Sequence, residues 1–381
     1  MPAPEHQSPP LRLHGEQRPE RDRGLTGIRG IAALMVVIYH FQDTFVRLVP
    51  ACSVLAPTAR VGLLGVDVFF ILSGLILCLV YRADEAAVTW ASHRRFLMLR
   101  IARVYPSHLA ALAAMGLLVA AANSAGVVVE GTFPVAQLPF QLTMTHAWFR
   151  SPGMEWNYPS WSISSEWFAY LFLFPLGSWY LRRRPGAWVH VVLAVVATQA
   201  WLHISNTSWP RALFPTLRIL CGFLGGVALY GVLRTAPWLV ALCRRFTTPL
   251  LMVFLLAVTV LPALWSHSPE LMFLSILGIL IGLTSERSLA ARWLGSEPMV
   301  RLGQWSYALY MSHAISGRVL AWLLPAERFA GSPMPLRVGV LVFYGVAIML
   351  GAVLLYHGVE KPAREWLRRP VRASSPEFVK A

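Results

Sequence analysis

Arg29 and His40 are the residues of this chain most clearly placed to do chemistry. They lie in the run GIRGIAALMVVIYHF, within the first long apolar stretch, 25–45. The spacing is close to three turns of an α-helix, so both side chains would project from one face, about 16 Å apart along the axis. Ionisable residues within a bilayer are costly and tend to face a bundle interior or a wet cavity. The pair therefore indicates an intramembrane functional site.

His40 is the candidate catalytic residue. An imidazole can act as a base, an acid or a nucleophile at neutral pH. Asp67, in GVDVFFILSG, could orient His40 or pair with an arginine. A lone histidine in a membrane can also serve only in hydrogen bonding between helices. The helix face shared with Arg29 favours the catalytic role.

Arg100 and Arg103, in RIARVYP, lie where a loop is predicted to enter the third apolar span. Two guanidinium groups one helical turn apart suit phosphate groups, because each offers a planar fork of donors. Ordinary anchoring of a helix end by basic residues is the alternative. Pro106 is expected in the first turn of that helix, where its missing N–H costs nothing.

A second carboxylate occurs in the run PSWSISSEWF, where Ser162 and Glu166 are neighbours on one helix face. Pro159 and Ser160 are helix start signals, and they would place Glu166 about one turn below the outer interface. A carboxylate there could accept a proton or bind substrate hydroxyls. The alternative is that this stretch only caps and tethers the helix.

Aromatic and histidine side chains recur at a spacing of three in SYALYMSH, as Tyr307, Tyr310 and His313. They would line one helix face. Such a stripe is also typical of helix packing. The candidate substrate-binding residues are Ser162, Tyr310 and His313.

The composition indicates how these residues must be positioned. Of 381 residues, 56% are hydrophobic and only 13% are charged, which is far from a soluble domain of this size. An all-α, polytopic membrane protein is predicted. About 20 apolar residues cross a bilayer, and on that measure we predict ten spans: 25–45, 61–80, 104–122, 161–181, 187–204, 212–233, 248–265, 271–285, 302–325 and 336–357.

The net charge of +15 has a topological explanation. With the N-terminus inside, most of the Lys and Arg residues fall on the cytoplasmic side, as the positive-inside rule requires. Both termini are therefore predicted to be cytoplasmic, and no nucleic-acid partner is indicated. The longest connection, 123–160, then lies outside. Its prolines would interrupt a regular membrane-spanning helix, and its apolar side chains disfavour full exposure to water. We therefore expect a re-entrant or interfacial cap.

The chain is predicted to form one membrane domain, 25–360, between a disordered cytoplasmic tail, 1–24, and a basic cytoplasmic tail, 361–381. The first apolar run lacks a signal-peptide cleavage site. The four cysteines show neither metal spacing nor a disulfide framework. The sequence also lacks a GxSxG elbow, an HExxH motif and a P-loop, and no metal site is predicted.

Six motifs, in order over residues 25–362, resemble the acyltransferase 3 family of bacterial membrane O-acyltransferases. They are Arg29-x10-His40, GVDVFFILSG, Arg100-x2-Arg103 with Pro106, WSISSEWF, SYALYMSH and YHGVEKP. One departure is Ser165, which stands before a single glutamate where many relatives have two carboxylates. The chain also resembles stand-alone members, which carry no C-terminal esterase-like domain.

The resemblance implies a multi-pass protein of the bacterial inner membrane. Such a protein would move an acyl group, usually acetyl, from cytoplasmic acyl-CoA to a hydroxyl of a glycan or lipid-linked sugar. His40 would be the catalytic histidine, and Arg29, Arg100 and Arg103 would serve the donor. Asp67 and Glu166 match further catalytic motif positions. Acyl-CoA would be a co-substrate, with no permanently bound cofactor.

Three questions stay open at this level. His40 either deprotonates the acceptor hydroxyl or takes the acyl group itself. The acceptor is a cell-envelope or exported glycan, with a small metabolite such as a macrolide as the alternative. A secondary transporter is a rival class, because buried charges also line transport routes. Inverted repeats with matching broken helices are not evident, which disfavours transport.

Overall fold

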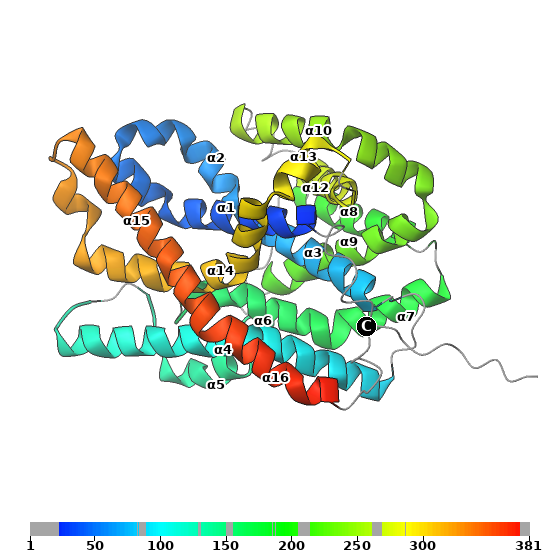
Figure 1. Ribbon diagram of the computed structural model, residues 1–381, viewed down its shortest axis with the longest axis horizontal. Helices are drawn as coiled ribbons and strands as arrows, with labels where there is room; N and C mark the ends of the chain where they lie inside the picture. The colour runs from blue at the N-terminus through cyan, green and yellow to red at the C-terminus, as the bar shows by residue number, and fades with distance from the viewer. Residues whose placement is uncertain are drawn as a thin grey trace, which may run out of the picture.

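The computed structural model describes residues 23–81, 83, 89–128, 131–149, 155–184, 186, 188–204, 214–260, 269–285 and 287–373. Helices dominate these residues (Figure 1). The long ones are α1 (Arg23–Leu48), α3 (Leu64–Tyr81), α4 (Trp90–Ser124), α8 (Trp188–Ile204), α9 (Phe214–Thr235), α10 (Pro237–Val260), α12 (Pro269–Leu283), α14 (Glu297–Leu323) and α15 (Met334–Leu355). The shorter ones are α2 (Ala56–Arg60), α5 (Leu138–Leu142), α6 (Trp161–Phe168), α7 (Phe174–Arg183), α13 (Leu289–Leu294) and α16 (Lys361–Ala373).

The predicted spans coincide with these helices. In its described part, each of the ten ranges falls on one helix or on a run of consecutive helices, apart from 284–285 and 324–325, which follow the ends of α12 and α14. Among the described residues, six helices are long and apolar enough to cross a membrane. The all-α membrane class is therefore confirmed. The count of ten spans and the cytoplasmic termini stay predictions.

One boundary differs from the prediction in a way that matters for the site. The expectation that Pro106 lies in a first helical turn is wrong, because α4 begins at Trp90 and holds Pro106 in its interior. The start is fixed by a capping box, in which Ser92 N donates to Thr89 Oγ1 (3.2 Å) and Thr89 N donates to Ser92 Oγ (2.9 Å). Arg100 and Arg103 therefore lie on a regular helix and not in a loop.

Helix α1 runs through the centre of the bundle between α14 and α3, and α3 packs in turn on α9. The α1–α14 contact is so close that a Cβ on Gly303 would overlap the carbonyl oxygen of Thr26. Polar contacts hold the start of the same pair: Arg23 Nε donates to Gly295 O (2.7 Å), and Glu297 pairs with Arg23 (3.3 Å) and Arg301 (3.0 Å). Hydrogen bonds from Arg301 and Arg23 hold the pKa of Glu297 below its usual range.

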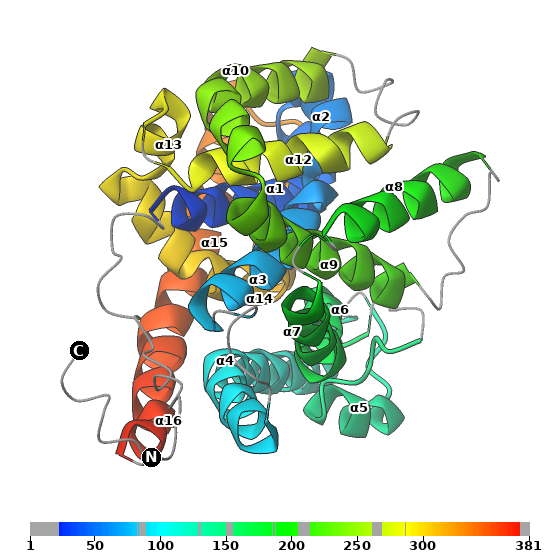
Figure 2. The same ribbon diagram turned by 90° about the vertical axis from the view of Figure 1, so that its right-hand side faces the viewer.

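The other helices are arranged around this centre. In Figures 1 and 2, α10, α12 and α13 lie on one side of α1 and α3, and α4 and α5 lie on the opposite side. Two π-helical segments, η5 (Ala169–Leu173) and η8 (Tyr356–Glu360), join α6 to α7 and α15 to α16 without a break. Because of the second junction, α16 continues from α15 and packs against α4.

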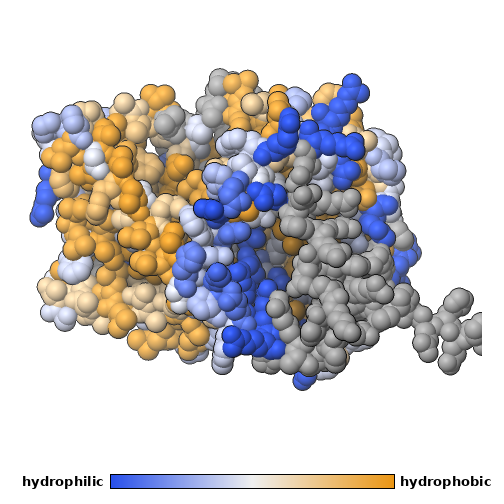
Figure 3. All heavy atoms as spheres, in the orientation of Figure 1, coloured by the Kyte–Doolittle hydropathy of each residue, from blue (hydrophilic) through white to orange (hydrophobic). Residues whose placement is uncertain are grey.

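Surface hydropathy agrees with a membrane setting. Hydrophobic side chains cover much of the face that α15 presents, and a hydrophilic band begins toward α16 (Figure 3). Residues 361–373 of the predicted basic tail form α16, whereas 374–381 and the first 22 residues lie outside the described part of the chain.

The long connection after α4 packs onto the bundle. Tyr105 Oη donates to Leu142 O (3.0 Å), and His108 Nε2 lies 2.8 Å from Gln141 O. Further on, Asn157 Nδ2 donates to Met311 O (3.0 Å), deep against α14. Residues 155–160 therefore run between helices before α6 begins at Trp161, the start that Pro159 and Ser160 predict.

Candidate active site

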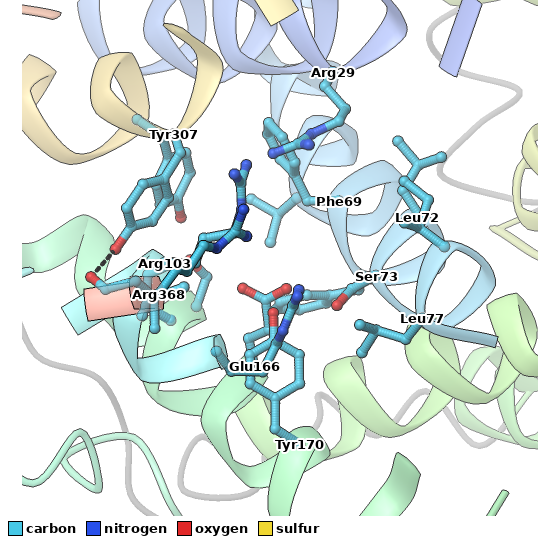
Figure 4. A pocket seen from close by; sticks show the side chains of 18 residues that line it. Arg29, Phe69, Leu72, Ser73, Leu77, Arg103, Glu166, Tyr170, Tyr307 and Arg368 are labelled. Atoms are coloured by element: carbon cyan, nitrogen blue, oxygen red, sulfur yellow. Dashed lines mark hydrogen bonds between the residues drawn. The ribbon is translucent and has the colours of Figure 1, made fainter. Parts of the chain in front are cut away.

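A cavity of about 270 Å³ lies between α1, α3, α4, α6, α14 and α16 (Figure 4). Its apolar wall comes mainly from α3, including Phe69, Leu72 and Leu77. Its polar lining is formed by Arg29, Ser73, Arg100, Arg103, Ser162, Glu166, Tyr170, Tyr307, Tyr310 and Arg368. Six of the predicted site residues belong to this lining: Arg29, Arg100, Arg103, Ser162, Glu166 and Tyr310.

The cavity is strongly basic. Four of its lining residues are arginines, and Glu166 is the one carboxylate among the lining residues in the described chain. The charges that act on Arg29 include Arg103, Glu166 and Glu360. Guanidinium groups gathered in a partly apolar space are stabilised by an anion. The cavity therefore has the chemistry to bind a ligand that carries several negative charges.

Glu166 lines the same cavity as Arg29, Arg100 and Arg103. The sequence signal for the helix start is correct, but residues 155–160 enter the bundle before it. His146 Nε2 and Ser160 Oγ are 3.1 Å apart beneath the connection, so α6 begins at an interior position. Within the cavity, the Tyr170 side chain hydrogen-bonds to Glu166 and to Ser73.

Tyr307 and Tyr310 attach α14 to the cavity in different ways. Tyr307 Oη donates to Val104 O (2.6 Å), which ties α14 to α4 (Figure 4). Tyr310 hydrogen-bonds to Ser162, and its ring lies 6.0 Å from that of Phe69. Ser162 and Tyr310 are therefore direct neighbours, although they are far apart in the sequence.

His40 lies in a separate cluster of rings. Its ring centroid is 4.8 Å from that of Tyr158 and 5.2 Å from that of His313, with which it is stacked. His313 is wholly buried, and its Nδ1 is 3.3 Å from Leu309 O. His40 is exposed. The pair thus presents one accessible imidazole with a second imidazole enclosed behind it.

The surroundings of this histidine pair are aromatic and cationic. The guanidinium carbon of Arg318 lies 5.2 Å from the ring centre of Tyr158 and 5.8 Å from that of Phe133. Both rings belong to the connection between α4 and α6. This segment therefore supplies part of the wall around His40.

The cavity and the histidine pair meet at one residue. His40 does not line the cavity with Arg29, even though both lie on α1. Tyr310 lines the cavity, and its ring is 5.9 Å from that of His313. The site therefore has two compartments, a basic cavity and a histidine cluster, with Tyr310 at the boundary.

Asp67 pairs with Arg218. Its two oxygens each accept a hydrogen bond from Arg218, at 2.7 Å, and Arg218 also donates to Leu63 O at 2.7 Å. This bidentate pair joins α3 to α9. Of the two roles that the sequence left open for Asp67, the structure shows the pairing with an arginine.

Sequence reasoning missed four residues of the two compartments: Ser73, Tyr158, Tyr170 and Arg368. Arg368 was counted only among the basic residues of a tail, because nothing local shows that α16 returns to α4. Tyr158 precedes the helix start signals and carries no motif of its own. Only the three-dimensional path of the connection brings it to His40.

These features define an all-α, multi-pass membrane protein with a basic cavity beside a histidine pair. Comparison with known families then gives the particular assignment. The family described as "Acyltransferase domain", which is the acyltransferase 3 family, matches residues 22–357. The chain belongs to this family, and the protein is a transferase of acyl groups.

Two relatives are informative. The chain is 29% identical to "Acyltransferase MdmB" of Streptomyces mycarofaciens, over 93% of this chain and 94% of that protein. It is 42% identical to "Protein 2 in picA locus" of Rhizobium radiobacter, over 26% of this chain and 45% of that protein. No solved structure matches the chain.

Proposed function

We propose that the protein is a membrane O-acyltransferase of the bacterial inner membrane. It takes an acyl group, most simply acetyl, from cytoplasmic acyl-CoA and places it on a hydroxyl of a cell-envelope or exported glycan. The observation that carries this proposal is the basic cavity between α1, α4 and α16, with an accessible histidine beyond it.

The donor fits the basic cavity. On the predicted topology, α1 and α14 begin in the cytoplasm, and Arg29 lies near that end of α1. Arg29, Arg100 and Arg103 then offer fork-shaped donors to the phosphates of acyl-CoA. The apolar wall from α3 suits the pantetheine arm. Tyr310 is where that arm would leave the cavity toward His40.

Two routes of acyl transfer are compatible with His40. In the first, its imidazole takes the proton of the acceptor hydroxyl while the hydroxyl oxygen attacks the thioester carbon. The C–S bond breaks, and the proton passes to the CoA thiolate. In the second, the imidazole nitrogen attacks first and releases CoA thiol. The acceptor hydroxyl then displaces the acyl group from the imidazole.

The acceptor would approach on the side of the long connection. His40 is exposed there, beside the rings of Tyr158 and Phe133 and the guanidinium of Arg318. Flat aromatic faces pack well against the apolar faces of sugar rings, and arginine binds sugar hydroxyls and acidic groups. A glycan acceptor is consistent with this wall.

Acceptor-dependent release of CoA from acetyl-CoA by the purified protein tests the proposal. We expect His40→Ala to lower the turnover number by about 100-fold or more, because removing a general base or nucleophile costs that much. Mass spectrometry of surface glycans from a deletion strain should show the loss of an acetyl-sized unit. His190→Ala is the matched control, since His190 is an exposed residue of α8.

The outcomes separate the rival classes. Substrate uptake without CoA release would show a transporter. Normal acyl transfer by His40→Ala would show that His40 is not the catalytic residue. Acyl-enzyme that accumulates with donor alone would select the two-step route.

A further inference from the structure

We infer that Arg368 of α16 is a fourth phosphate-binding side chain of the donor site. We infer that Arg368 binds a phosphate group of the nucleotide part of acyl-CoA. This inference rests on the proposed function and extends it to a helix beyond the matched family region, which ends at residue 357. Nothing in the sequence around Arg368 indicates the role.

The position of Arg368 follows from the continuous helix that carries it. The chain passes from α15 through η8 into α16 without a turn. At the start of α16, Arg364 pairs with the buried Glu360 (3.5 Å) and lies over the ring of Tyr356 (6.0 Å). Arg368 is one helical turn further along the same face. Its side chain is among those that line the cavity (Figure 4).

The charges around the cavity indicate the ligand. Arg368 joins Arg29, Arg100 and Arg103 around a space whose lining includes one carboxylate, Glu166. An acyl-CoA molecule carries a diphosphate and a further phosphate on its ribose. Four guanidinium groups can share these charges, whereas three leave part of them unmatched.

A lipid headgroup would offer the same phosphate chemistry, but it fits other residues of α16. Arg369 and Trp366 are exposed and are not among the residues that line the cavity, as expected of a basic amphipathic helix on a membrane surface. Arg368 is partly buried and lines the cavity. Arg369 is therefore a matched control: it is the same residue type on the same helix.

The test compares Arg368→Gln, Arg368→Lys and Arg369→Gln with the wild-type protein in uncharged detergent. We expect Arg368→Gln to raise the KM for acetyl-CoA about tenfold, with kcat within twofold, because one charge-assisted contact is lost. The KM of Arg368→Lys should lie between those of the wild type and Arg368→Gln, since lysine keeps the charge but lacks the planar fork of donors. Arg369→Gln should match the wild type. Size-exclusion chromatography checks that each variant folds.

A second arm identifies the phosphate. With dephospho-acetyl-CoA, a KM equal for wild type and Arg368→Gln places Arg368 on the ribose phosphate. A persistent tenfold difference places it on the diphosphate. Equal KM values for Arg368→Gln and Arg369→Gln with acetyl-CoA would overturn the inference. So would a difference that arises only in nanodiscs containing phosphatidylglycerol, because that result would assign Arg368 to a lipid headgroup.

Failure of this inference is distinguishable from failure of the proposed function. If the wild-type protein neither binds nor turns over acetyl-CoA, the proposed function fails. If the wild-type protein does both and Arg368→Gln behaves as Arg369→Gln does, only the role of Arg368 fails.

Discussion

His40 and His313 have the same side chain but different surroundings. His40 is exposed, while the stacked ring of His313 is wholly buried and has Nδ1 near Leu309 O. His40 can therefore meet a substrate directly. His313 stacks on His40 and can hold its ring in place. We therefore predict a positioning role for His313, with the substrate contact expected from the sequence as the alternative.

Replacing His313 by phenylalanine tests this difference at the scale of one residue. We expect kcat to fall about 10- to 100-fold, because a small displacement of a catalytic group is costly, while the KM for acyl-CoA stays within twofold. Steady-state kinetics, with each substrate varied in turn, measure kcat and the two KM values separately. His190→Phe on α8 is the control. An unchanged kcat, or a change in the acceptor KM alone, would contradict the positioning role.

At the scale of elements, the buried pair of Asp67 and Arg218 joins α3 to α9. The two side chains are only 20% and 12% exposed. Breaking a buried pair leaves an uncompensated charge. A contact of this kind is sufficient reason for Asp67 to be present, whether or not it takes part in the reaction.

Asp67→Asn should therefore lower the free energy of unfolding by about 3 kcal/mol. Unfolding titrations in mixed detergent measure it, with the exposed Asp43→Asn as the control. We expect the folded fraction of Asp67→Asn to keep most of its kcat. A variant that folds with wild-type stability and has lost kcat would instead show that Asp67 is catalytic.

The contact of α1 with α14 sets how close His313 on α14 lies to His40 on α1. Gly303 approaches Thr26 O so closely that Gly303→Ala must push the helices apart. We expect a loss of about 1–3 kcal/mol in stability, together with reduced kcat, because Tyr310 and His313 move with α14. Thermal unfolding and CoA release measure these effects. Gly345→Ala on the open face of α15, where an added Cβ meets nothing within 4 Å, should leave both unchanged.

At the scale of the whole molecule, local patterns predicted the helices because each span is a long apolar run. The family resemblance groups Arg29, Arg100 and Arg103 as donor residues, and the structure places all three in the lining of one cavity; their donor role stays a prediction. Local patterns did not place Glu166 beside these arginines, since its depth depends on how residues 155–160 enter the bundle. They missed Arg368 for the same reason: the return of α16 to α4 is a matter of long-range packing.

The topology itself is open to a direct test with native cysteines. Cys52 follows the first predicted span, and Cys243 lies near the start of the seventh; both are partly exposed, whereas Cys78 and Cys221 are buried. With the N-terminus inside, a membrane-impermeant maleimide should label Cys52 in spheroplasts of Cys243→Ser. In Cys52→Ser it should label Cys243 only after the membrane is permeabilised.

The pair of labels also decides the form of the long connection. An additional crossing within 123–160 would leave Cys52 outside and move Cys243 to the same side. Labelling of both cysteines in intact spheroplasts would therefore replace the re-entrant or interfacial cap by a full span. It would also reverse the side from which α10, α14 and α16 begin. The donor would then lose its cytoplasmic route to Arg368. Labelling of Cys52 alone would instead place the four arginines of the cavity on the cytoplasmic side, where acyl-CoA is made.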